Sequence, residues 1–175
     1  EKFLWFVSSE NYLVLAGRDA SQAEQIFCKH MGPQDIFVQA DVAGARSCFV
    51  KNIAGGEVPP ATLREAGTMA LCHSSAWDKR MVISAWWVTA EQVSRAPAGS
   101  TAPLADNSVM VEGFIVSGQR NFMPPVHLEM GMTVLFHVGE SSAARHRGER
   151  RSRYLENLAS GAGGSKEEEE EEEGG

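Results

Sequence analysis

The chain has 175 residues, 43% of them apolar, which is enough for one domain with a buried core. Its formal net charge is −7, but seven of the 23 acidic residues form one glutamate run at 167–173, so the first 165 residues carry 15 basic and 16 acidic side chains. A domain this close to neutrality is excluded as a general polyanion binder, and the longest uncharged apolar stretch, 81–90, is far below the ~18 residues of a membrane-spanning helix.

The first predicted elements are a hairpin, a helix and two strands. Residues 3–8 and 12–16 are rich in aromatic and β-branched side chains, with turn chemistry between them. A helix is expected from Ser21, because Ser21 and Glu24 have the spacing of a capping box, and a Gly-Pro pair ends it. Half-buried antiparallel strands are expected at 35–41 and 46–52.

The longest predicted helix follows two prolines and a second capping box, formed by Thr62 and Glu65, and runs to about Trp77. Its small residues, Ala66, Gly67 and Ala70, allow the helix to lie close against a sheet.

Residues 81–89 form the strongest predicted strand, and its period of two sends Trp86 and Trp87 to opposite faces. A loop is expected at 96–107 and the last two strands at 109–116 and 133–138.

Strands and helices do not alternate regularly along the chain. This order favours an α+β fold, with a mixed, largely antiparallel sheet and two main helices packed on it. Residues 1–139 are expected to fold as the domain. Residues 140–175 are expected to be a mobile linker, basic and then acidic, with a short helical turn at 154–158.

The cysteines give little sign of structural or catalytic chemistry. Their odd number and wide spacing indicate reduced thiols in the cytosol or nucleus, rather than disulfides or a zinc ribbon. Cys72 is the best candidate nucleophile, but helical neighbours point about 100° apart, so His73 cannot activate it. Asp35 and Asp41 are a weak candidate metal pair. We expect no enzymatic activity, no metal and no cofactor.

A recognition surface has better support. Seven cations lie in or beside predicted turns and strand ends, where side chains can converge on phosphate: Arg18, Arg46, Lys51, Lys79, Arg80, Arg95 and Arg120. Scattered solvated charges are the simpler alternative. Three tryptophans are candidate platforms for stacked bases, with core packing as their alternative: Trp77, Trp86 and Trp87.

Several ordered segments resemble the NFACT-R domain, over roughly residues 1–150: WFVSSENYLV at 5–14, DIFVQAD at 35–41, PPATL at 59–63, EAGTMA at 65–70, SAWWV at 84–88 and NFMPP at 121–125. The chain departs from the family pattern at Gln39 and Ala43, where relatives usually carry histidines.

The resemblance implies an RNA-contacting piece of a larger cytoplasmic protein, with the nucleus as an alternative location. Family members bind large ribosomal subunits stalled with peptidyl-tRNA, support the ubiquitin ligase Listerin and recruit tRNA for C-terminal tailing. The implied partners are therefore tRNA, rRNA of the large subunit and, in the full-length context, the ligase. A protein-docking module without RNA contact is the rival interpretation, and a Cys72-dependent hydrolase is a third.

Overall fold

The computed structural model describes residues 2–96, 107–132, 134 and 137–146. The chain divides into two compact units, Glu1–Leu135 and Phe136–Gly175. The described part of the second unit contains helix α4 (Glu140–Ala143) and a short 3-10 turn, η2 (Ala144–His146). The rest of the predicted linker, with its helical turn at 154–158, and most of the predicted 96–107 loop lie outside the described residues. Within the described ranges, no helix is long and apolar enough to cross a membrane.

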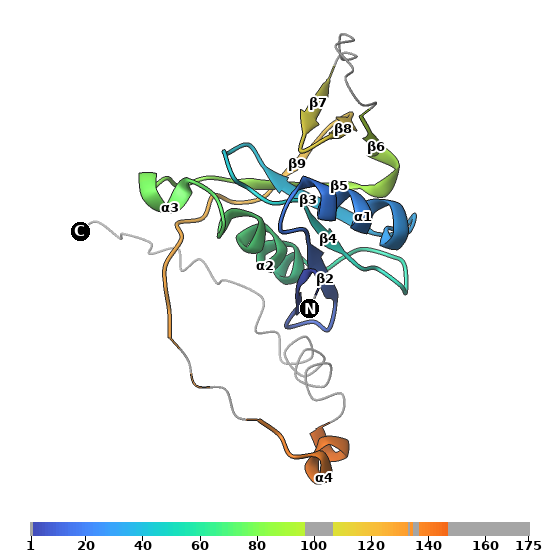
Figure 1. Ribbon diagram of the computed structural model, residues 1–175, viewed down its shortest axis with the longest axis vertical. Helices are drawn as coiled ribbons and strands as arrows, with labels where there is room; N and C mark the ends of the chain where they lie inside the picture. The colour runs from blue at the N-terminus through green and yellow to red at the C-terminus, as the bar shows by residue number, and fades with distance from the viewer. Residues whose placement is uncertain (1, 97–106, 133, 135–136, 147–175) are drawn as a thin grey trace, which may run out of the picture. The chain divides into compact units, whose positions relative to one another are not determined.

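The first unit is built on a six-stranded antiparallel sheet (Figure 1). Its strand order is β1-β2-β4-β3-β5-β9. The bounds are β1 (Leu4–Val7), β2 (Leu13–Ala16), β4 (Cys48–Val50), β3 (Ile36–Ala40), β5 (Ala85–Thr89) and β9 (Asn121–Phe122). The opening hairpin and the antiparallel strands expected at 35–41 and 46–52 are thereby confirmed, but β3 and β4 are not half-buried: every residue of both strands is buried, because both faces of the sheet are covered.

A smaller antiparallel sheet has the order β6-β8-β7, with β6 (Val93–Arg95), β8 (Phe114–Ser117) and β7 (Ser108–Val111). A 3-10 turn, η1 (Ala90–Gln92), connects β5 to β6. The single strand predicted at 109–116 is wrong, because this stretch folds back on itself. Glu112 and Gly113 have φ values of 46° and 87°, as a two-residue hairpin turn requires.

Different layers cover the two faces of the large sheet. Helix α2 (Pro60–Leu71) packs on one face, where its small residues Ala66 and Ala70 are fully buried. Helix α1 (Ala20–His30) and the small sheet cover the other face, around the buried rings of Phe37, Phe49, Trp86 and Phe114. The predicted α+β class, with two main helices packed on a largely antiparallel sheet, is confirmed.

The helix starts differ from both predicted capping boxes. Helix α1 is capped by Asp19, whose Oδ1 accepts a hydrogen bond from the Gln22 N–H at 2.8 Å, and not by Ser21. Helix α2 follows Pro59, which provides no side-chain cap. A carboxylate oxygen of Glu10, in the β1–β2 turn, instead accepts hydrogen bonds from the Thr62 backbone N–H and hydroxyl.

Two further predicted boundaries are wrong. Helix α2 ends at Leu71, and Trp77 belongs to a separate short helix, α3 (Ala76–Lys79). The Ser74 side chain ends helix α2: its hydroxyl donates to the Leu71 carbonyl at 2.7 Å and accepts a hydrogen bond from the Ala76 N–H. The strand predicted at 133–138 is also wrong for the residues described there, since Val134, His137 and Val138 belong to no strand.

Candidate nucleic-acid interface

One end of the large sheet collects basic residues from separate parts of the chain. Strands β2 and β3 end there, while β4 and β5 begin, because each adjacent pair is antiparallel. Arg18 follows β2, and Arg46 precedes β4. We call this the basic end of the sheet.

Arg46 fastens this end rather than projecting from it. Its Nη1 donates to the carbonyl oxygens of Gly17 and Arg18, at 3.1 Å in the case of Gly17. Its backbone N–H donates to the Ala70 carbonyl at 3.0 Å. The guanidinium thus ties the β2–α1 connection to the β3–β4 loop, and α2 is tied to the same loop through the backbone. One face of Arg46 is already occupied by protein.

Lys79 and Arg80 approach the same end through α3. The Ser75 backbone N–H, directly before α3, donates to the carbonyl of Ala43 in the β3–β4 loop at 2.9 Å. Gly44 has a φ of 82°, and a Cβ there would lie 3.2 Å from the His73 carbonyl oxygen, so the loop needs glycine to approach this closely. Arg18, Lys79 and Arg80 are all exposed.

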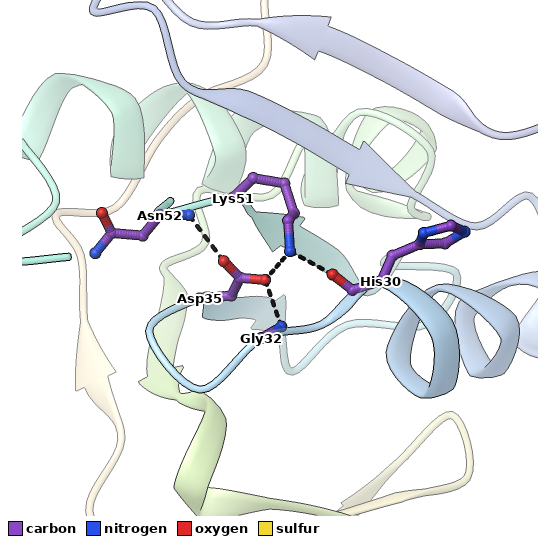
Figure 2. Close-up of polar contacts among 5 residues, drawn as sticks. All are labelled: His30, Gly32, Asp35, Lys51 and Asn52. Carbon is purple, nitrogen blue, oxygen red and sulfur yellow. Dashed lines mark hydrogen bonds and ion pairs between the residues drawn. The ribbon is translucent and has the colours of Figure 1, made fainter. Parts of the chain in front are cut away.

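Lys51 lies at the opposite end of the sheet and is bound within the protein (Figure 2). Its ammonium group contacts the Asp35 carboxylate and the His30 carbonyl oxygen. Asp35 also accepts hydrogen bonds from the backbone N–H groups of Gly32 and Asn52, at 2.7 and 2.8 Å. With its charge neutralised by Asp35 and two of its three N–H groups donated within the protein, Lys51 joins α1, β3 and β4, and we no longer assign it to RNA.

Two more of the predicted cations are paired with acids. Arg95 forms an ion pair with Glu24 of α1, although its side chain remains 61% exposed. The Nη1 of Arg120 lies 2.6 Å from Oδ2 of Asp41, at the end of β3. The Arg120 guanidinium also lies over two rings, 5.2 Å from the Trp86 centroid and 5.1 Å from the Phe122 centroid.

The predicted tryptophans occupy three different environments. Trp86 is fully buried, and its Nε1 donates to Asp41 at 2.9 Å, so its ring is not accessible as a platform for a base. Trp87 is half-buried on the opposite face, against the α2 core. Trp77 is 36% exposed, and its Nε1 donates to the Cys72 carbonyl at 2.5 Å. The prediction that β5 carries a tryptophan on each face is confirmed, and core packing accounts for Trp86.

The groups considered for catalysis are in unfavourable settings. The Cys72 thiol donates to the Met69 carbonyl at 3.2 Å, and burial raises its pKa despite the opposing effect of Arg46. Burial and the Arg46 charge lower the pKa of His73. Asp35 and Asp41 flank opposite ends of β3, so they cannot share a cation. Among the described residues, no group of three or more metal-ligating side chains comes together.

Two residues around Arg120 were not predicted from the sequence: Phe122 and Gln92. Phe122 is 58% exposed, on the edge strand β9, and contacts Arg120. Gln92 donates from Nε2 to the carbonyls of Ser117 and Gln119, both at 3.0 Å, which fixes the turn before Arg120. Phe122 lies within the NFMPP segment at 121–125, but the neighbouring residue types do not indicate that this segment forms a two-residue edge strand with the ring exposed.

A comparison with protein-family models matches residues 2–113 to the family described as the NFACT protein RNA binding domain. The chain belongs to this family. It is 51% identical over 164 residues to the human ribosome quality control complex subunit NEMF. The aligned residues cover 91% of this chain and 15% of that protein. It is 43% identical over 152 residues to ribosome quality control complex subunit 2 of Schizosaccharomyces pombe. That alignment covers 86% of this chain and 14% of the yeast protein.

An archaeal protein is also similar in sequence, and one solved structure is similar in fold. The archaeal Rqc2 homolog of Methanocaldococcus jannaschii is 34% identical over 141 residues, covering 80% of this chain and 20% of that protein. The chain thus spans between about a seventh and a fifth of the length of these relatives. The C-terminal part of the fibronectin/fibrinogen-binding protein from Streptococcus suis superposes with a TM-score of 0.57, at 12% identity, over 74% of this chain and 47% of that chain. At this identity the match concerns the fold alone.

Proposed function

We propose that this NFACT RNA-binding domain contacts tRNA or large-subunit rRNA during the rescue of stalled ribosomes, in the cytoplasm and without enzymatic activity of its own. The observation that carries the proposal is the match of residues 2–113 to an RNA-binding domain family. The relatives named as ribosome quality control subunits supply the setting. Within the longer protein, the domain would help recruit tRNA for C-terminal tailing and support the ubiquitin ligase.

The basic end of the sheet offers the contact surface. Arg18, Lys79 and Arg80 reach it from two distant parts of the chain and are exposed. Such side chains hold phosphate and sugar, which sets the position of an RNA without reading its sequence. Asp19 and Asp78 are also exposed beside them, so the net positive charge is small and RNA shape must contribute.

The test is binding of the chain to tRNA at several salt concentrations. We expect the double substitution of Lys79 and Arg80 by alanine to weaken binding and to reduce the slope of log K against log salt by about 1.5, because each phosphate contact contributes about 0.7–0.9. Lys29→Ala, which removes an exposed charge from the last turn of α1, is the matched control and should leave the slope unchanged. An unaltered slope in the double variant would remove these two residues from the interface.

The rival function is docking on a protein through the apolar surface of the domain. The described residues include a cleft of about 530 Å³ between α2 and β5, lined by Leu63, Trp87 and Met123 among others. Crosslinking separates the two readings. Adducts from the basic end to RNA support our proposal, whereas adducts to protein alone would replace it with the rival.

A further inference from the structure

Phe122 is a large aromatic ring at one edge of the large sheet. It lies on the edge strand β9, pairs with Trp86 across the ladder and remains 58% exposed. The Arg120 guanidinium lies 5.1 Å from the Phe122 centroid and 5.2 Å from the Trp86 centroid. The guanidinium therefore contacts one ring that is buried and one that reaches solvent.

Arg120 is held in place by its other partners. Its Nη1 contacts Oδ2 of Asp41 at 2.6 Å, and Oδ1 of the same carboxylate accepts from the Trp86 indole at 2.9 Å. The Arg120 side chain is only 23% exposed. Because Asp41 neutralises it, Arg120 is poorly suited to attract phosphate, but its flat group supports the Phe122 ring from a fixed position.

A polar cavity of about 510 Å³ adjoins this ring. Its lining includes Asn107, Ser108, Gly118, Gln119, Arg120 and Phe122. The turn that carries Gly118 and Gln119 is preorganised, since Gln92 donates to the carbonyls on either side of Gly118 and accepts from the Thr89 backbone N–H at 3.2 Å. The cavity thus combines an exposed aromatic ring with the Gln119 amide on a fixed turn and with the Asn107 amide and Ser108 hydroxyl at the start of β7.

We propose that this cavity, which we call the Phe122 cavity, accepts an unpaired RNA base that stacks on Phe122. The inference rests on the proposed function and adds a base-binding site to it. A base has a π-face for the ring and a hydrogen-bonding edge for amides such as those of Gln119 and Asn107. An apolar peptide side chain would use the ring but leave these polar groups without partners.

Binding of a short single-stranded oligoadenylate to the full chain tests the proposal. Phe122→Leu keeps an apolar side chain but removes the π-face, so we expect affinity to fall by about 5- to 150-fold, the range for one stacked base. The salt slope should not change, because the ring is neutral. Phe122→Trp should bind at least as well as the parent chain.

Two controls make the result specific. Trp5→Leu removes another ring, 51% exposed, from the opposite edge strand of the same sheet, and should leave affinity unchanged. An oligonucleotide of abasic ribose-phosphate should bind the parent chain and Phe122→Leu equally weakly. Equal affinity of both proteins for oligoadenylate, or only protein adducts from a photocrosslinker at position 122, would overturn the Phe122 cavity as a base site.

The outcome also separates this inference from the proposed function. If the parent chain binds RNA with a salt slope that depends on Lys79 and Arg80, but Phe122→Leu has no effect, only the base site is lost. If the parent chain binds neither tRNA nor oligoadenylate, both proposals fall together.

Discussion

Glu10 caps helix α2 through Thr62, which is 52 residues away in the chain. Its Oε2 accepts from the Thr62 backbone N–H at 2.9 Å and from the Thr62 hydroxyl at 2.6 Å. We expect Glu10→Ala to lower the free energy of unfolding by about 1–2 kcal/mol, as the loss of a helix cap does. Urea unfolding measures it. Glu57→Ala, which removes an exposed acid before the same helix, is the control, and an equal loss in both variants would contradict the capping role.

Lys51 should matter for stability and not for RNA. Its partner Asp35 has a side chain only 4% exposed, so Lys51→Met leaves a buried carboxylate without its counter-ion. We expect a loss of about 3 kcal/mol in urea unfolding, in the range known for breaking buried pairs. Adding Asp35→Asn should recover part of the loss, whereas additive effects would show that the two side chains are not coupled. Lys29→Met, at an exposed position, is the control.

The Asp41 carboxylate has two partners, the Trp86 indole and the Arg120 guanidinium, and two substitutions of Asp41 should distinguish their contributions to stability. Asp41→Ala removes the acceptor of the buried Trp86 indole, which we expect to lower the free energy of unfolding by about 1–2 kcal/mol. Asp41→Asn retains an acceptor oxygen and loses only the Arg120 ion pair, so its loss should stay below about 1 kcal/mol. Thermal unfolding compares the two. If both variants lose the same amount, the indole bond is not the stabilising contact.

The three cysteines should react with iodoacetamide in the order of their exposure. Cys28 is exposed, Cys72 is half-buried and Cys48 is buried. Burial raises the pKa of Cys72 and Cys48, so each has a smaller thiolate fraction in the folded protein at about pH 8 than it has when unfolded. We expect Cys28 to label first, Cys72 slowly and Cys48 only after denaturation, as peptide mass mapping over time would show. Labelling of Cys72 as fast as Cys28 would revive the nucleophile interpretation.

Local patterns were sufficient for most of the large sheet and for the presence of α2, but not for the boundaries of α2. The hairpin at the start, strands β3 to β5 and the close approach of Ala66 and Ala70 follow from alternation, small residues and turn chemistry. The hairpin within 109–116 was predicted as one strand because its turn contains Glu112 with a positive φ, a conformation that glutamate rarely adopts. Both helix starts misled because the caps are other side chains than the predicted ones: Asp19, two residues before Ser21, and Glu10, 52 residues before Thr62.

The interface was harder to predict because its charges are paired across long distances in the sequence. Glu24 meets Arg95, and Asp41 meets Arg120 after 79 residues. No local pattern records such pairs, so counting cations near strand ends overestimated the surface available to phosphate. The same long-range assembly creates the Phe122 cavity, whose lining comes from the start of β7, the turn at 118–120 and β9.

The late position of β9 in the chain affects how the domain forms during translation. When the chain has emerged from the ribosome only as far as β8 (Phe114–Ser117), every other strand of the large sheet is outside, while β5 still lacks its outer neighbour β9. Nascent chains interrupted there carry an open sheet edge at Trp86 and Trp87, which is a template for unwanted pairing with other polypeptides. Emergence of β9 therefore covers this edge at Trp86 and Trp87 by antiparallel pairing.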